Sequence, residues 1–350
     1  MRILMIGFGN VGQKIAEIFS KQPEDTKLSL LQPVFIGIFT ANHGAVVNDR
    51  GLPLKNCLEF YRKHKTFDAS YAHYFRGTVI EAIRSLVYDV MIEVSTLSIK
   101  DHGEPAVSYV TLALEAGRHV VLANKGPIAF RYRELSKLAD KKQVHLLFES
   151  TVMDGTPVFS LSKAGLIGCT VTAISGIFNS TTNIVMDGIR RGKSAEEAIH
   201  DAQALGIAEA DPRLDLDGWD CAVKLAVLGN VLMGTDINPA KIPRDEFTPV
   251  IPELARQAFK SGKYIRQVGK IWREHGKVYF KVAYSPLPES DPFSSVSGTS
   301  SAIRIETDCM CPQVILQENP GLADTAYGII NDLLTIQSAG SAIPVKAIAD

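Results

Sequence analysis

The sequence is poor in cysteine, in excess charge of either sign and in long apolar runs. Its five cysteines are an odd number spread over 350 residues, which excludes a disulfide-stapled secreted scaffold and suits free thiols in a reducing compartment. No apolar run reaches the length of a transmembrane helix, and the N-terminus lacks a basic segment followed by a cleavage site. We therefore expect a cytoplasmic protein with no membrane partner.

Two of the cysteines, Cys309 and Cys311, stand close together and invite interpretation as a metal site. A zinc site needs a second pair of Cys or His residues at ligand spacing, and none accompanies these two. We interpret them as neighbouring residues of a strand. The remaining cysteines are Cys57, Cys169 and Cys221.

The charge balance points to a small-molecule partner. A formal net charge of −1 and a pI near 6.7 give no electrostatic reason to expect binding to nucleic acid or to an anionic membrane. The chain is 46% hydrophobic and 21% charged, which is typical of a globular protein, and its length is sufficient for two domains.

The N-terminus carries a glycine-rich turn between a predicted strand and a predicted helix. The apolar run Arg2–Ile6 precedes the turn, and Val11–Phe19 has helical spacing. In this context a G-x-G-x-x-G pattern predicts a dinucleotide site, because the glycines let a pyrophosphate approach the helix N-terminus. The residues of the turn, all candidates for cofactor binding, are Gly7, Phe8, Gly9, Asn10, Val11 and Gly12.

The next strand bears on the choice between the two nicotinamide cofactors. The strand Val34–Phe39 ends at Thr40 with no acidic residue at the position where an NAD-specific fold usually holds the ribose hydroxyls. The nearest acid is Asp49, followed by Arg50. An adenosine 2′-phosphate is therefore not repelled, and NADP(H) is favoured over NAD(H), with Thr40 close to the ribose.

Further strands and helices alternate along the first half of the chain. Strands are expected at Tyr88–Ser95 and His119–Asn124. This alternation predicts an α/β, Rossmann-type domain with a doubly wound parallel sheet, whose ligands bind at the carboxyl ends of the strands. Ser95, Thr96 and Lys125 would lie at that edge and are candidates for cofactor binding.

The pattern changes after about residue 148, which predicts a second, α+β domain. We expect residues 1–148 with about 320–350 to form the dinucleotide-binding domain and residues 149–319 to form the second domain. The closing helix Asp324–Ile336 is expected to pack on the first domain. Pro286, Pro288 and Pro292 are expected to mark a surface loop. The elements expected in the second domain are the strands Thr170–Phe178, Lys277–Ala283 and Ser301–Thr307 and the helices Asn183–Arg191, Ala195–Leu205 and Trp219–Met233.

The stretch Ala208–Asn230 joins a run of acids to an apolar helix. Between Trp219 and Met233 the only charged side chains are Asp220 and Lys224, one helical turn apart. A helix that is apolar all round is normally buried, and buried charge is costly unless it is paired or used. We interpret the pair as the polar wall of a site; the alternative is an exposed ion pair worth roughly a few tenths of a kcal/mol. A calcium loop is excluded because Arg213 and Lys224 would occupy its first and last ligand positions.

Five segments spread over nearly the whole chain form a family pattern. They are the glycine-rich turn, Ala123–Pro127, Glu149–Val152 with Pro157, Gly176–Asn183, and Gly206–Pro212 continuing to Lys224. Together they resemble homoserine dehydrogenases, and the last is long and specific enough that chance is a poor explanation.

The resemblance implies an oxidoreductase of threonine and methionine biosynthesis. Its reaction is the reversible NAD(P)H-dependent reduction of L-aspartate 4-semialdehyde to L-homoserine. Lys224 and Asp220 would be the catalytic pair, with Lys125 also at the reacting oxygen. The second domain would carry the dimer contacts of a homodimer. No regulatory domain follows, so feedback by threonine is not expected.

The resemblance also assigns residues that hold the substrate and a cation. Glu209 and Asp215 would bind the substrate ammonium group, with Thr181 reaching it through its backbone or hydroxyl and Ser180 in the same loop. A monovalent cation, usually sodium in the family, would be bound by four residues. These are Glu149, Val152, Asp154 and Thr156.

Three departures from the family pattern keep two other functions open. Ser180 replaces a usual Gly, Ile207 replaces a frequent Tyr, and the segment 318–326 replaces a more glycine-rich loop. One alternative is a non-catalytic NAD(P)-binding sensor. The other is a semialdehyde dehydrogenase with a cysteine nucleophile, which requires an activated thiol beside a base; no cysteine here follows a strand with such a neighbour.

Overall fold

The computed structural model describes residues 1–21 and 27–340 and divides into two compact units. Unit 1 comprises Met1–Pro127, Arg133–Thr156 and the C-terminal segment from Leu322. Unit 2 comprises Ile128–Tyr132 and Pro157–Gly321. Among the described residues, no helix combines the length and the apolar composition needed to cross a bilayer.

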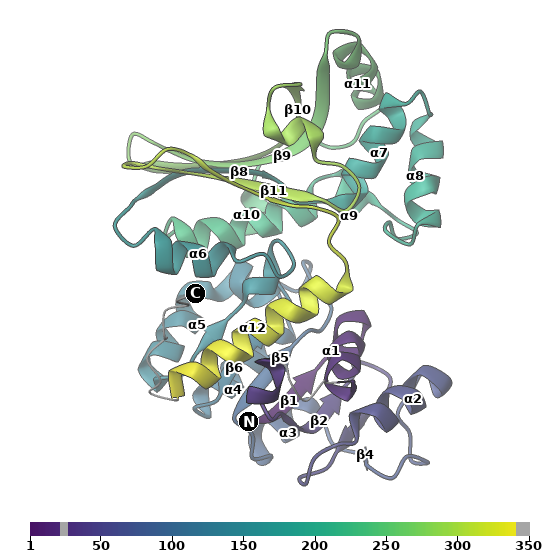
Figure 1. Cartoon of the computed structure of the whole chain (residues 1–350), viewed down its shortest axis with the longest axis vertical. Coiled ribbons are helices and arrows are strands. Elements are labelled where there is room, and N and C mark those ends of the chain that lie inside the picture. Colours follow the sequence, from purple (N-terminus) through teal and green to yellow (C-terminus); the bar gives the residue numbers. More distant parts are fainter. Residues whose placement is uncertain (22–26, 341–350) are drawn as a thin grey trace. The chain divides into compact units, whose positions relative to one another are not determined.

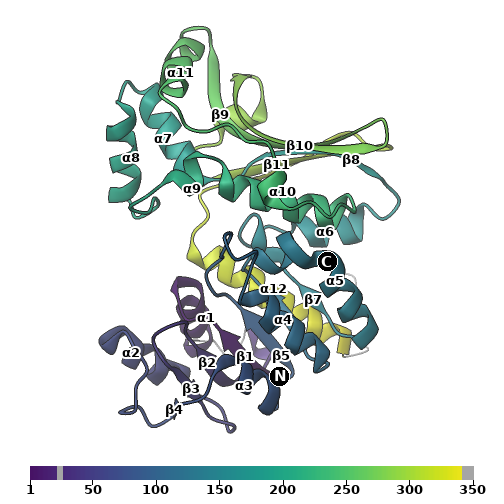
Figure 2. The same ribbon diagram turned by 180° about the vertical axis from the view of Figure 1, so that it is seen from behind.

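Unit 1 is a doubly wound α/β domain, as the sequence predicts. Its sheet has the order β4-β3-β2-β1-β5-β6-β7, in which β2, β1, β5, β6 and β7 are parallel and β3 and β4 form an antiparallel edge. Helices α1 and α12 cover one face and α3 and α4 the other (Figures 1 and 2). Its strands are β1 (Arg2–Ile6), β2 (Val34–Phe39), β3 (Ala45–Val47), β4 (Tyr74–Phe75), β5 (Val90–Glu93), β6 (His119–Leu122) and β7 (Leu146–Leu147). Its helices are α1 (Asn10–Ser20), η1 (Lys27–Leu30), α2 (Leu54–His64), α3 (Val79–Ser85), α4 (Ala106–Glu115), α5 (Gly126–Lys142, whose residues Ile128–Tyr132 belong to unit 2), η2 (Glu149–Thr151) and α12 (Leu322–Gly340).

The closing helix packs on the first domain, as expected. Ala326, Ile329 and Leu333 of α12 are fully buried in one cluster with Ile3 of β1 and Ile15 of α1. An amphipathic helix that buries such a stripe is stabilised mainly by this packing. The C-terminal segment therefore completes the core that holds the glycine-rich turn.

Unit 2 is an α+β domain built on an antiparallel sheet with the order β10-β9-β8-β11-β12. Helix α10 lies along one face of this sheet (Figure 1). The strands are β8 (Val171–Ile177), β9 (Lys263–Glu274), β10 (Lys277–Pro288), β11 (Ser301–Thr307) and β12 (Gln313–Gln317). The helices are α6 (Val158–Gly165), α7 (Ser180–Arg190), α8 (Ala195–Ala204), α9 (Arg213–Leu216), α10 (Trp219–Leu232), η3 (Pro239–Lys241), α11 (Val250–Lys260) and η4 (Pro292–Ser295).

Helix α10 is buried on nearly all sides, which confirms the expectation from its composition. Its residues from Cys221 to Asn230 are buried with the exception of Lys224, which is partly exposed. Close approach to the sheet depends on Gly269 of β9, because a Cβ there would lie 2.7 Å from the sulfur of Cys221. The helix therefore holds Asp220 and Lys224 in a rigid setting.

Three expectations from the sequence are corrected. Pro286 and Pro288 belong to β10 and not to a loop; proline is tolerated there because β10 is an edge strand and needs no second ladder partner. Cys309 and Cys311 lie in the connection between β11 and β12, not within a strand. The segment 149–156 falls in unit 1, because Glu149 and its neighbours are hydrogen-bonded to α12.

Candidate functional site

The three glycines of the N-terminal turn have three distinct geometries. Gly7 has φ of 103°, and a Cβ there would lie 2.5 Å from the carbonyl of Val94. A Cβ on Gly12 would lie 2.5 Å from the carbonyl oxygen of Gly7. A Cβ on Gly9 would meet nothing within 4 Å. The turn is therefore tight on both sides and open at Gly9, which leaves the first N–H groups of α1 accessible, as a pyrophosphate site requires.

The loop after β2 turns back without an acid at the strand end. The hydroxyl of Thr40 donates to the carbonyl of Gly44 at 2.8 Å and accepts from the backbone N–H of His43 at 2.7 Å. The antiparallel strand β3 then carries Asp49 away, so that its backbone carbonyl accepts from Arg2 at the opposite end of β1. Arg50 follows Asp49 directly, so neither residue lies at the end of β2, where the ribose is expected.

The ends of β5 and β6 bring three polar side chains together at the same edge of the sheet. Glu93 is fully buried, and its carboxylate accepts from the backbone N–H of Ser95 at 3.0 Å. Asn124 donates to the Ser95 hydroxyl at 3.4 Å and accepts from the N–H of Gly126 at 2.9 Å. Lys125 follows as the half-buried N-cap of α5. Ser95 and Lys125 were predicted at this edge from the sequence. Glu93 was not, because every residue of its strand is buried and no alternation singles it out.

Glu93 is expected to make stability depend on pH. Burial raises the pKa of Glu93 from 4.5 to about 7. Between pH 4.5 and about 7 the folded protein keeps a proton that the unfolded chain has released. The free energy of unfolding therefore falls as pH rises through this range, by about 3 kcal/mol at most, and this contribution is constant above it. Glu93→Gln has no such proton. Its melting temperature should fall less than that of the parent between pH 5 and pH 8, and equal falls would contradict the prediction.

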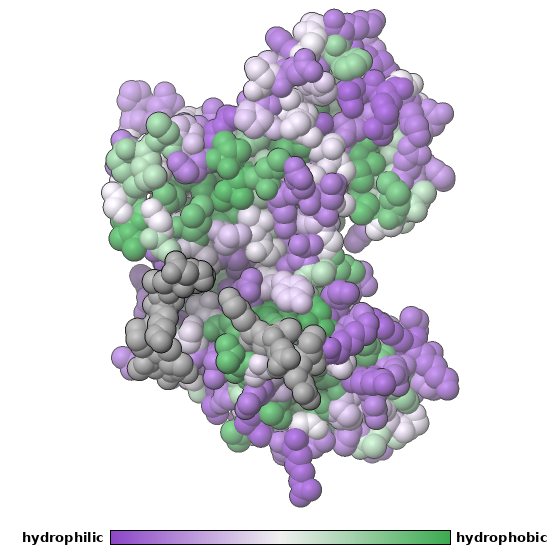
Figure 3. Space-filling model, in the orientation of Figure 1, coloured by the Kyte–Doolittle hydropathy of each residue, from purple (hydrophilic) through white to green (hydrophobic). Residues whose placement is uncertain are grey.

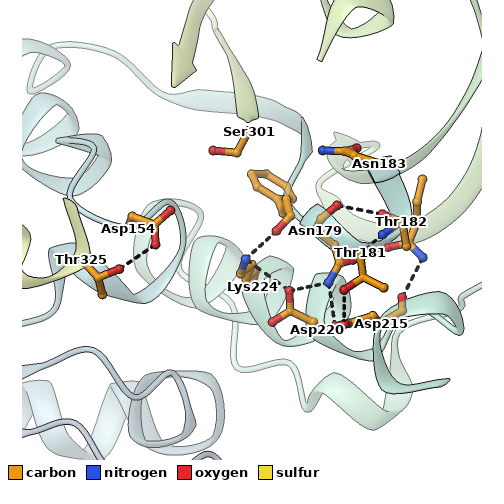
Figure 4. A network of polar contacts seen from close by, with 12 residues as sticks. Asp154, Asn179, Thr181, Thr182, Asn183, Asp215, Asp220, Lys224, Ser301 and Thr325 are labelled. Atoms are coloured by element: carbon orange, nitrogen blue, oxygen red, sulfur yellow. Dashed lines mark hydrogen bonds and ion pairs between the residues drawn. The ribbon is translucent and has the colours of Figure 1, made fainter. Parts of the chain in front are cut away.

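The segment 149–156 gathers oxygen atoms beside α12. Glu149, Val152 and Thr156 are buried. The carboxylate of Asp154 accepts from the hydroxyl of Thr325 at 2.8 Å (Figure 4). Asp332 accepts from the N–H of Glu149 at 3.1 Å, and burial raises the pKa of Asp332 to about 8. Within the described residues no group of three or more His, Cys, Asp or Glu side chains is arranged to hold a metal. A cation here would depend on one carboxylate and backbone carbonyls, which is a weak donor set suited to a single charge.

Lys224 and Asp220 form a largely buried ion pair on α10. The Lys224 Nζ lies 3.2 Å from Asp220 Oδ2, and the two side chains are only 15% and 18% exposed. The ammonium group also donates to the carbonyl oxygen of Phe178 at 2.5 Å (Figure 4). An exposed ion pair, the alternative interpretation, is therefore wrong. A charged amine held in this way can stabilise negative charge on a neighbouring oxygen.

Asn179 connects this ion pair to a second carboxylate. Its amide donates to Asp215 Oδ1 at 2.7 Å and to Asp220 Oδ2 at 3.2 Å (Figure 4). The hydroxyl of Thr181 donates to the other oxygen of Asp215 at 2.7 Å. Burial, and then the charge of Asp220, raises the pKa of Asp215. Asn179 was not singled out in the sequence, although it lies in the segment Gly176–Asn183 and caps the helix α7.

The remaining predicted substrate residues lie outside this network. Glu209 is exposed, and its carboxylate makes none of these hydrogen bonds. Ser180 is the half-buried first residue of α7, and Ile207, expected in the wall of the pocket, is half-buried before α9. Thr96 of unit 1, a candidate for cofactor binding, is exposed.

No cysteine in this region is ready to act as a nucleophile. Cys221 lies beside Asp220 but is buried, and burial raises the pKa of its thiol. A nucleophilic cysteine needs the opposite, an environment that favours the thiolate. The thiol-dependent alternative therefore has no candidate residue on α10.

Two family profiles match the chain in succession. The profile described as "Homoserine dehydrogenase, NAD binding domain" matches residues 7–149, and the profile described as "Homoserine dehydrogenase" matches residues 157–334. The glycine-rich turn and the polar network around α10 fall within these matches, whereas residues 150–156 lie between them.

Similar proteins carry the same description over their whole length. Homoserine dehydrogenase from Methanocaldococcus jannaschii is 30% identical over 340 residues, covering 97% of this chain and 99% of that protein. The NAD(+)-dependent homoserine dehydrogenase of Pseudomonas canavaninivorans is 28% identical and covers 97% of both chains. A mutant hyperthermophilic archaeal homoserine dehydrogenase in complex with NADPH has a TM-score of 0.80 at 26% identity, covering 98% of both chains.

Proposed function

The chain belongs to the homoserine dehydrogenase family, an NAD(P)-dependent oxidoreductase family, and we propose that it reduces L-aspartate 4-semialdehyde reversibly to L-homoserine with Lys224 as its central catalytic residue. The observation that carries the assignment of Lys224 is its largely buried ion pair with Asp220. When bound, the nicotinamide supplies the hydride. The protein's own residues must hold the aldehyde and provide one proton.

Lys224 has the charge and the setting for that proton. The aldehyde oxygen gains negative charge as the carbon is reduced, and an ammonium group stabilises this charge and can donate the proton. Asp220 and the carbonyl of Phe178 hold the ammonium in place. In the reverse direction Lys224 accepts the proton of the alcohol. Lys125 is the second candidate at the reacting oxygen.

The acids around α9 suit the ammonium group of the substrate. Asp215, with Thr181 beside it, is a partly enclosed carboxylate. Glu209 is exposed and is proposed to contact the same group when substrate binds. Glu209→Ala should then raise KM for L-homoserine by about 10-fold, the loss of one charged hydrogen bond, with little change in kcat. An unchanged KM in a steady-state assay would remove this contact, and Glu253→Ala on α11 is the control.

For the cofactor we propose NADP(H) over NAD(H). No acid stands at the end of β2. His43 and Lys65 are both exposed, and the segments that carry them are joined by a hydrogen bond from Phe67 N–H to the carbonyl of His43 at 2.7 Å. The positive charge of Lys65 and the ring N–H of His43 suit an adenosine 2′-phosphate. One relative is named NAD(+)-dependent and another was solved with NADPH, so rates with the two cofactors decide the matter.

A monovalent cation, sodium in the first place, is proposed for the segment 149–156. Glu149 would bind it through its carboxylate, and Val152, Asp154 and Thr156 through backbone oxygens. The side chain of Asp154 already accepts a hydrogen bond from Thr325. The cation would stabilise the conformation of segment 149–156 next to α12.

We also propose a homodimer formed by unit 2. The strand β12 alternates, with Val314 and Leu316 more than 40% exposed, and Figure 3 shows hydrophobic residues gathered on the surface of unit 2. Such apolar surface marks a protein interface. Leu316→Glu should weaken the dimer at least about 10-fold, because a charge would be buried in the interface. Light scattering after gel filtration measures this, Lys277→Glu is the control, and a parent that is monomeric at all concentrations refutes the interface.

One assay separates the proposed reaction from its alternatives. Nicotinamide absorbance is followed with L-homoserine and either NADP+ or NAD+, with and without inorganic phosphate. Oxidation without phosphate supports homoserine dehydrogenase. Strict dependence on phosphate supports the cysteine-dependent enzyme, and cofactor binding without turnover supports a sensor.

A further inference from the structure

Cys169 and Cys309 form a pair of thiols that are remote in sequence and adjacent in unit 2. Cys169 precedes β8 and is half-buried, while Cys309 lies in the β11–β12 connection and is exposed. The Cys309 thiol donates a hydrogen bond to the sulfur of Cys169 across 2.8 Å, although the two residues are 140 positions apart. A disulfide bond is about 2.05 Å long. The sulfurs therefore need to approach by only about 1 Å to bond.

The backbone around the two thiols has the geometry that a cross-strand disulfide needs. The antiparallel register of β8 and β11 pairs Val171 with Thr307. One position further, the N–H of Asp308 donates to the carbonyl of Thr170 at 3.1 Å. The next opposed pair is the two cysteines, at a position without ladder hydrogen bonds. Opposed Cα atoms at such positions are about 4.5 Å apart, which lies within the span of a disulfide.

We propose that Cys169 and Cys309 are a redox-active pair that forms a reversible intramolecular disulfide when it meets a small disulfide oxidant such as oxidised glutathione. One thiolate attacks the oxidant, forming a mixed disulfide and releasing one glutathione thiolate. The second cysteine thiolate then displaces the other glutathione. The two cysteines lose two protons and two electrons in total, and one glutathione disulfide becomes two glutathione thiols.

The hydrogen bond between the thiols indicates the order of the two steps. It is the main cause that raises the pKa of Cys309 to about 11, with further contributions from desolvation and then from Asp308. Cys309 is therefore a slow nucleophile on its own. We expect the mixed disulfide to form first at Cys169 and Cys309 to resolve it.

The disulfide would close the start of β8 onto the β11–β12 connection. Strand β8 leads at its other end into Phe178 and Asn179, which contact the Lys224–Asp220 pair. A cross-link over so long a loop stabilises the folded chain by restricting the unfolded one. Reduced glutathione would reopen it, as is usual for a disulfide in a reducing compartment.

The test compares the parent with two matched cysteine variants. Fully reduced protein is incubated with oxidised glutathione, digested without reduction and mapped by mass spectrometry. The parent should give one peptide pair joined through Cys169 and Cys309, remain a single chain on a non-reducing gel, and melt roughly 5 °C or more higher until dithiothreitol is added. Cys309→Ser should lose the cross-link and the shift, whereas Cys311→Ser should keep both.

Other outcomes overturn the proposal. A bond from Cys169 to Cys311, a bond between two chains, or glutathione adducts with no internal link would each exclude this pair. Reduced Cys309→Ser should oxidise L-homoserine at the parent's rate, since neither thiol belongs to the catalytic network. The redox result is therefore independent of the proposed function.

Discussion

Replacing Lys224 with alanine is expected to lower kcat for L-homoserine oxidation by roughly two orders of magnitude or more. The substitution removes the ammonium group that lies 3.2 Å from Asp220 and donates to the carbonyl of Phe178. Without it, the developing charge on the aldehyde oxygen has no cation at this position. Steady-state rates at saturating cofactor and substrate measure the loss.

The fold of this variant should persist with reduced stability. Asp220 keeps its hydrogen bond from Asn179 but loses its cationic partner, which should cost about 1–3 kcal/mol. Circular dichroism melting separates this cost from the catalytic effect. Lys193→Ala is the matched control, since that lysine pairs with Asp201 on a more exposed part of the chain. Near-normal turnover by purified Lys224→Ala would remove the residue from the mechanism.

The second large effect is expected at the open glycine of the N-terminal turn. Gly9→Val should raise the dissociation constant of NADPH by roughly 10- to 100-fold, because its side chain would fill the space beside the first N–H groups of α1 and cost a charged hydrogen bond to the pyrophosphate. A Cβ at this position touches nothing within 4 Å in the protein itself. The melting temperature without cofactor should therefore stay within about 2 °C of the parent's.

Substitution of Gly12 is the control, because it is expected to destabilise the free protein itself. Gly12→Val places its Cβ 2.5 Å from the carbonyl oxygen of Gly7, so it should lower the melting temperature even without cofactor. Fluorescence titration with NADPH and thermal melting of the free protein distinguish the two variants. If Gly9→Val bound NADPH as the parent does, the open face of the turn would not be the pyrophosphate site.

The local signals in the sequence predict the elements around the site well. The strands Arg2–Ile6, Val34–Phe39 and Ser301–Thr307 have the predicted bounds. The first two consist mainly of apolar residues, whereas the third alternates isoleucine with Arg304 and Glu306. The apolar helix beginning at Trp219 ends one residue before the predicted end. Its two charges were correctly placed in a partly buried setting, since an apolar helix leaves them no polar face.

What the sequence could not predict depends on contacts between distant residues. Asn179 links two carboxylates that lie 36 and 41 positions away, and no local pattern encodes such distances. Glu209 belongs to the same motif as Asp215 but is exposed. The motif alone did not predict this difference, because it does not indicate which side chains are buried. Strand β9 was not predicted, although it lies between β8 and β10 in the unit 2 sheet.

The two prolines of β10 influence how copies of this protein can associate. Pro286 and Pro288 have no N–H to offer, Lys277 and Lys281 add charge to the same outer strand, and the segment 243–245 already hydrogen-bonds the outer edge at Val282. Each of these features opposes pairing with a further strand on that side. The β12 margin at the far side has no proline. Strand pairing through only one margin of a sheet cannot propagate from copy to copy, which protects the protein from forming fibres.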